Sequence, residues 1–66
     1  MTEHERYCLR HAAQFICVRG RNPKTRSRAS FATREAAQAH ANRIGDGRTM
    51  IYAVTDGGHS AHIENR

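Results

Sequence analysis

The alternation of apolar and polar residues predicts short strands in the first half of the chain. The segment 14–19 is rich in aromatic and β-branched residues and ends directly before Gly20. The next residues, 20–24, include glycine, asparagine and proline, which favour a chain reversal. We therefore expect a central strand at 14–19, a turn, and a second strand at 25–31.

The second strand has two chemically different faces. Ala29 and Phe31 share one face, and Arg26 and Arg28 lie on the other, because side chains alternate along a strand. Burial of Phe31 would therefore turn both arginines toward solvent together.

For the strand at 14–19 the pattern leaves the buried face open. Either Ile16 and Val18 face the helix, or Phe15 and Cys17 do. In the first case Phe15 would lie on the open face of the sheet, where an aromatic ring can stack on a base.

The residues 34–44 have the features of an amphipathic helix. Thr33 is a favourable N-cap, Glu35 lies in the first turn where the helix dipole favours an acid, and Gly45 follows the end. One stripe recurs at positions i, i+4 and i+7 and is expected to pack on the sheet: Ala37, Ala41 and Ile44.

A hairpin is predicted for the last part of the chain. The residues 48–55 and 59–64 flank Asp56-Gly57-Gly58, which favours a tight loop of two residues. The pairing is expected to bring five apolar residues onto one face: Met50, Tyr52, Val54, Ala61 and Ile63. This spacing favours a buried stripe over an exposed binding surface.

The first thirteen residues are the least regular. Tyr7 and Leu9 alternate with arginines and favour a strand at 6–10, whereas a helix over 3–13 is the alternative. Together the patterns predict one α+β domain spanning residues 1–66. Its antiparallel sheet has four to five strands, with one helix packed on one face, in the order β-β-α-β-β.

The size and composition of the chain limit its function. A chain of 66 residues with 38% hydrophobic residues buries only about 60% of its unfolded surface, which leaves no room for a deep active site. We therefore expect no enzymatic activity, and the thin core is compatible with a homodimer. The lack of an apolar run or an N-terminal signal pattern favours a cytoplasmic protein.

The net charge of +5 is concentrated in one segment. The region 19–34 contains six bases and no acid, whereas the rest of the chain has five bases and six acids. Such a local positive field favours contact with phosphates, although a solvated basic loop is the simpler alternative. The candidate nucleic-acid-binding residues are Arg19, Arg21, Lys24, Arg26, Arg28 and Arg34.

Histidines and cysteines suggest metal binding at first sight, but their spacing argues against it. His59 and His62 are three residues apart on a predicted strand, so they would point to opposite faces. We expect no metal, no cofactor and no catalytic residue, and we interpret Cys8 and Cys17 as small, reduced, buried thiols.

The run from Gly20 to Ala37 contains Ser-Phe-x-Thr-x-x-Glu-Ala after a basic hairpin. Over residues 14–44 it resembles the arm-binding N-terminal domains of phage-type integrases. It also resembles small bacterial or phage ββαβ proteins with the same strand–helix junction. In the integrase domains the sheet docks in a DNA groove. The resemblance therefore implies DNA contacts from Arg19, Arg21, Lys24, Arg26 and Arg28, followed here by an additional hairpin.

Two functional hypotheses follow. The first is a non-catalytic nucleic-acid-binding module that contacts the phosphate backbone through its basic hairpin, with DNA favoured over RNA. The second is a small protein-binding adaptor or inhibitor, either phage-encoded or bacterial, that engages an acidic protein surface.

Overall fold

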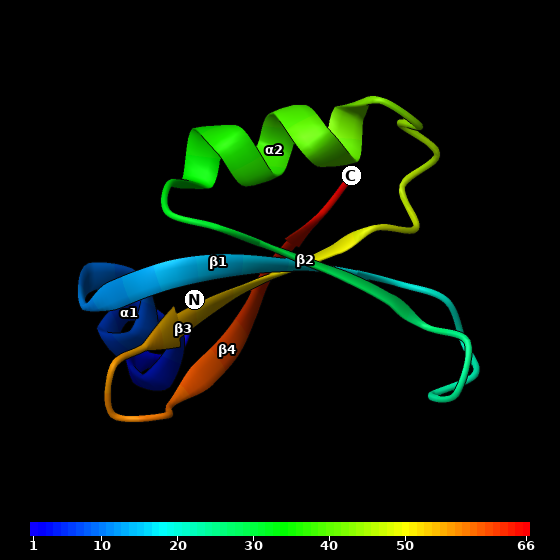
Figure 1. Ribbon diagram of the computed structural model, residues 1–66. Coiled ribbons are helices and arrows are strands. Elements are labelled where there is room, and N and C mark those ends of the chain that lie inside the picture. Colours follow the sequence, from blue (N-terminus) through cyan, green and yellow to red (C-terminus); the bar gives the residue numbers. More distant parts are fainter.

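Two helices and four strands make up the chain, and the computed structural model describes all residues from 1 to 66 (Figure 1). The elements follow one another as α1 (Glu3–Arg10), β1 (Ala12–Arg19), β2 (Ser27–Phe31), α2 (Arg34–Asn42), β3 (Met50–Thr55) and β4 (Ser60–Asn65). Neither helix is long and apolar enough to cross a membrane.

The four strands form one antiparallel sheet in the order β2-β1-β3-β4. β1 pairs with β2 through a hairpin and with β3 on its other side. β2 and β3 therefore run in the same direction, and α2 connects them by crossing over β1. β1 and β3 are the central strands, and β2 and β4 form the two edges.

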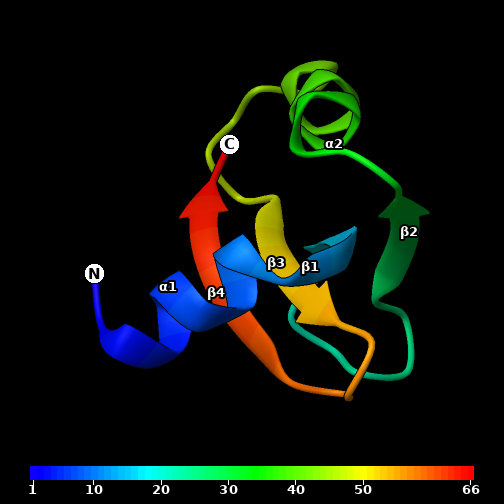
Figure 2. The ribbon, with the colours of Figure 1, turned by 90° about the vertical axis from the view of Figure 1, so that its left-hand side faces the viewer.

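The core lies between one face of the sheet and both helices. α1 packs against β3 and β4, whereas α2 packs against β1 and β2 (Figure 2). Small side chains in the contact allow the helices to lie close to the sheet. The buried cluster consists of Cys8 from α1, Ala37 and Ala41 from α2, and Phe15, Cys17, Ile51, Ala53 and Ala61 from the strands.

Several local predictions are confirmed. The hairpin of β1 and β2 is present, and Ala29 and Phe31 of β2 are more buried than the exposed Arg28 and Ser30. Helix α2 begins where the cap predicts, because the Thr33 hydroxyl accepts a hydrogen bond from the Ala36 amide at 3.2 Å.

The predicted strand at 6–10 is wrong, and the fold has two helices where one was expected. Thr2 caps α1, since its hydroxyl accepts a hydrogen bond from the Glu5 amide at 3.2 Å. Acids occupy the first turn, Arg10 lies in the last turn, and Cys8 is fully buried. The residues Thr2 and Glu5 have the spacing of a capping box, which is the sequence signal for this helix.

The predicted buried face of the last hairpin is wrong for β3, whereas Ala61 and Ile63 of β4 face the core as expected. Ile51, Ala53 and Thr55 face the helices, and Met50 and Tyr52 lie half-buried on the opposite face. Because all positions from 50 to 54 are apolar, their alternation does not identify the inner face.

The turn of this hairpin differs from the expected two-residue loop. The Thr55 amide donates to the His59 carbonyl at 2.8 Å, so three residues form the loop, and Gly58 has φ of 87°. Ala61 consequently pairs with Ala53 on the buried face.

The helix stripe is shorter than predicted. Ala37 and Ala41 are buried, but Ile44 follows the end of α2 and is 60% exposed. The stripe therefore ends with the helix.

Candidate nucleic-acid interface

One face of the sheet is not covered by either helix. The pairings place on it Arg28 and Ser30 from β2, Gln14, Ile16 and Val18 from β1, Met50, Tyr52 and Val54 from β3, and Ser60 and His62 from β4. We call these ten residues, together with Arg26, the open face. None of them is acidic, and six are large and apolar or aromatic, namely Ile16, Val18, Met50, Tyr52, Val54 and His62. The question left open for β1 is thereby answered, since Phe15 and Cys17 face the helices.

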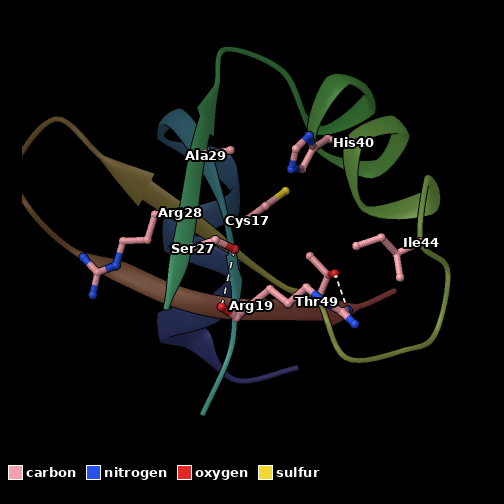
Figure 3. Close-up of a pocket in the computed structure, with 8 residues that line it drawn as sticks. All are labelled: Cys17, Arg19, Ser27, Arg28, Ala29, His40, Ile44 and Thr49. Atoms are coloured by element: carbon pink, nitrogen blue, oxygen red, sulfur yellow. Dashed lines mark hydrogen bonds between the residues drawn. The ribbon is translucent and has the colours of Figure 1, made fainter. Parts of the chain in front are cut away.

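The open face contains a shallow hollow of about 270 Å³. Its lining combines Arg26 and Arg28 from the β2 side with Ile16, Val18, Tyr52, Val54 and Ser60. Figure 3 shows that the Arg28 side chain points away from His40 and Ile44, which lie on the helix side of the sheet. Arg28 of β2 and Arg26, which directly precedes this strand, therefore lie on the uncovered face, as the alternation predicts.

The turn between β1 and β2 displays further cations. Asn22 organises it, because its side-chain oxygen accepts from the Lys24 amide at 3.0 Å and its carbonyl accepts from the Thr25 amide at 3.0 Å. Arg21 and Lys24 are exposed on this turn, and neither has a salt bridge. The turn is thus held by hydrogen bonds to Asn22, and the side chains of Arg21 and Lys24 stay free of these contacts.

Gly20 allows the chain to turn sharply at the end of β1 and to pass close to Arg26. Its φ is 116°, and a Cβ at this position would approach Arg26 Cα to 3.2 Å. The Gly20 carbonyl also accepts a hydrogen bond from Arg26 Nε at 3.3 Å.

Arg19 has an internal partner. Its guanidinium binds both carboxylate oxygens of Asp46, with Nη1 at 2.6 Å from Oδ1. Hydrogen bonds from Arg19 and from the Arg48 amide hold the pKa of Asp46 well below its ordinary value. Arg19 therefore fastens the loop before β3 to the end of β1, and its charge is compensated.

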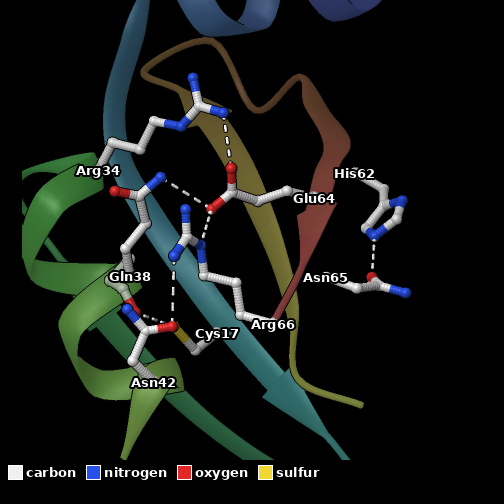
Figure 4. Close-up of polar contacts among 9 residues, drawn as sticks. Cys17, Arg34, Gln38, Asn42, His62, Glu64, Asn65 and Arg66 are labelled. Carbon is white, nitrogen blue, oxygen red and sulfur yellow. Dashed lines mark hydrogen bonds and ion pairs between the residues drawn. The ribbon is translucent and has the colours of Figure 1, made fainter. Parts of the chain in front are cut away.

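Arg34 lies apart from the other candidate residues. It begins α2 and donates to Glu64 Oε2 at 2.7 Å on the helix side of the sheet (Figure 4). Gln38 and Arg66 also donate to Glu64, each at 2.9 Å. The structure thus brings four of the six candidate residues to the open face or its hairpin turn: Arg21, Lys24, Arg26 and Arg28.

Sequence reasoning missed Arg48, which lies outside the basic segment. Arg48 and Arg21 line a second hollow of about 480 Å³ at the end of the sheet, next to Arg19 and Asn65. Arg48 is exposed and has no salt bridge. Arg48 is an isolated arginine in a loop that contains glycines, so the sequence alone does not predict that it lies beside Arg21.

The hollow on the helix side has a different character. It measures about 240 Å³ and is lined by Cys17, His40 and six other residues (Figure 3). The Cys17 thiol donates to the Ala37 carbonyl at 3.3 Å, and burial raises its pKa, which disfavours the nucleophilic thiolate. His40 packs on Phe31 with the ring centroids 5.1 Å apart.

No three side chains among the His, Cys, Asp and Glu residues come together as a possible metal site. The closest Cys–His contact joins Cys8 Sγ and His4 Nε2 at 3.7 Å within α1, and both cysteines are free and buried. The two thiols therefore serve as packing residues of the core.

Comparisons with protein-family models, curated proteins and solved structures give no match. The resemblance to the arm-binding domains stays a prediction.

Proposed function

We propose that the protein is a non-catalytic nucleic-acid-binding module that contacts the phosphate backbone through the hairpin of β1 and β2. One observation carries the proposal. Four cations without an acidic partner project from this hairpin, on or beside a sheet face that has no acid: Arg21, Lys24, Arg26 and Arg28. The resemblance to arm-binding domains favours DNA as the nucleic acid.

The ion pairs of the structure refine the expected number of phosphate contacts. Arg19 and Arg34 are engaged with Asp46 and Glu64, so their charges contribute less to an external anion. About four contacts would release about four counterions, which predicts that affinity for duplex DNA falls about 100-fold between about 50 and about 200 mM salt.

Removal of two of these cations provides the direct test. For the double variant Arg26→Ala/Arg28→Ala, about two phosphate contacts remain. We therefore expect its affinity to fall only about 10-fold between the lower and the higher salt concentration, against about 100-fold for the parent. Fluorescence anisotropy with labelled duplex and single-stranded DNA, repeated at several salt concentrations, gives this dependence directly.

The matched control is Arg6→Ala/Arg43→Ala, which removes the same charge from exposed positions of α1 and the end of α2. This control is expected to keep the salt dependence of the parent. An equal change in both double variants would show that net charge alone governs binding. Absence of binding to any nucleic acid at about 50 mM salt would contradict the proposal and favour the acidic-protein hypothesis.

A further inference from the structure

Two aromatic rings lie side by side on the open face. Tyr52 of β3 pairs with His62 of β4, and their ring centroids are 5.5 Å apart with an angle of 56° between the planes. On its other side Tyr52 pairs with Ile16 of β1. The two rings therefore extend an apolar surface from the centre of the sheet to the β4 edge.

Neighbouring side chains hold both rings in place. The Tyr52 hydroxyl lies 3.8 Å from Met50 Sδ, and a His62 ring nitrogen contacts the side-chain oxygen of Asn65 (Figure 4). Tyr52 remains half-exposed and His62 exposed, since no helix covers this face. The rings are thus both ordered by contacts and accessible to a ligand.

The cations of the open face lie across the sheet from these rings. Arg26 and Arg28 belong to the β2 side, and β1 separates β2 from β3. Neighbouring strands are about 4.8 Å apart, so the axes of β2 and β3 are separated by about 10 Å. Ile16 and Val18 fill the space between the cationic side and the aromatic side.

We infer that the open face selects single-stranded nucleic acid, with phosphates bound along β2 and bases stacked on Tyr52 and His62. This inference rests on the proposed function and specifies its ligand class. A single strand offers an anionic backbone and unpaired bases, and each base has a π face that can stack on an aromatic ring. The open face presents the matching groups on its two sides.

A duplex matches this surface less well. Its bases stack on one another and show only their edges in the grooves, so the faces of Tyr52 and His62 would find no partner ring. A second copy of the chain is also disfavoured, because face-to-face pairing would add four arginines and no acid to one interface. The absence of acids favours an anionic ligand.

The test compares Tyr52→Leu with Tyr52→Phe. Leucine is apolar and can still pack on the sheet, but it has no aromatic ring on which a base could stack. Phenylalanine retains the ring. We expect Tyr52→Leu to weaken binding of single strands about 10-fold and to leave duplex binding unchanged. Tyr52→Phe is expected to bind like the parent, and neither variant should change the salt dependence.

The probes are labelled oligothymidylate and oligouridylate of about 12 nucleotides, and a DNA duplex of the same length. Tighter binding of the two single strands than of the duplex supports the inference, and comparing the two single strands distinguishes DNA from RNA. The substitution His62→Ala at an exposed position provides a second variant that keeps the Tyr52 side chain, with an expected loss confined to the single strands.

The possible failures are distinguishable. If duplex and single strands bind equally with the expected salt dependence, and Tyr52→Leu matches the parent, the inference is overturned and the proposed function stands. If no probe binds, both are overturned. A thermal melt of each variant establishes that any loss occurs in folded protein.

Discussion

Replacing Ile51 with alanine is expected to unfold a large fraction of the protein at room temperature. Ile51 has an exposed fraction of 0% and lies in β3, between Cys17 of β1 and Glu64 of β4. Truncation of a buried isoleucine costs about 2 to 5 kcal/mol in free energy of unfolding. A single core of this size supplies only about 3 to 5 kcal/mol in total.

Urea unfolding followed by circular dichroism measures this effect. The control is Met50→Ala at the neighbouring position, which lies half-buried on the open face and is expected to cost about 1 kcal/mol or less. A larger loss for Met50→Ala than for Ile51→Ala would mean that β3 is oriented the other way. The open face and both proposals would then lose their basis.

Replacing Glu64 with glutamine is expected to remove much of the acid-sensitive stability. Burial alone would raise the pKa of Glu64, but hydrogen bonds from Arg34, Gln38 and Arg66 outweigh it and lower the pKa to about 2. Because the pKa is lower in the folded state, the contribution is present above about pH 4.5 and is lost as the pH falls toward about 2. A fall in the pKa from 4.5 to about 2 corresponds to about 3 kcal/mol at neutral pH.

The free energy of unfolding at neutral pH and at about pH 2 tests this linkage. We expect Glu64→Gln to be less stable than the parent at neutral pH and nearly equal to it in acid. The carboxylate of Asp46, which also has a lowered pKa, accounts for acid sensitivity that remains. Glu35→Gln is the control, because Glu35 is exposed and has no salt bridge. A parallel pH dependence in parent and Glu64→Gln would contradict the assignment.

Local signals made part of this fold predictable from the sequence. Thr33 and the alanines of α2 are a cap and a run of strong helix formers, and both act over a few residues. The hairpin of β1 and β2 follows in the same way from its turn residues, and Phe31 fixes which face of β2 is buried. These features depend little on the rest of the chain.

The orientation of β3 depends on tertiary contacts. With Met50 through Val54 all apolar, size decides which side faces the helices, and Ala53 fits beneath close-packed elements better than Tyr52 does. The three-residue loop after Thr55 then fixes the register of β4. The alternation of apolar and polar residues predicts neither which side chains are small enough to face the helices nor how long the loop is.

The candidate site was only partly predictable for a similar reason. The charge distribution identified the basic hairpin, but it could not show that Arg19 and Arg34 have acidic partners far along the chain. Asp46 follows Arg19 by 27 residues, and Glu64 follows Arg34 by 30. Such pairs form only when the fold brings distant segments together.

The two buried thiols give each helix its own chemical reporter. Cys8 is part of α1, and Cys17 lies beneath α2 with its thiol bonded to the Ala37 carbonyl. The Cys8 side chain is fully buried, and Cys17 is only 3% exposed although it lines the helix-side hollow, so labelling rates measure the local opening of each helix separately. Since the open face lies on the opposite side of the sheet, the same labelling can follow how a ligand bound there stabilises the helices.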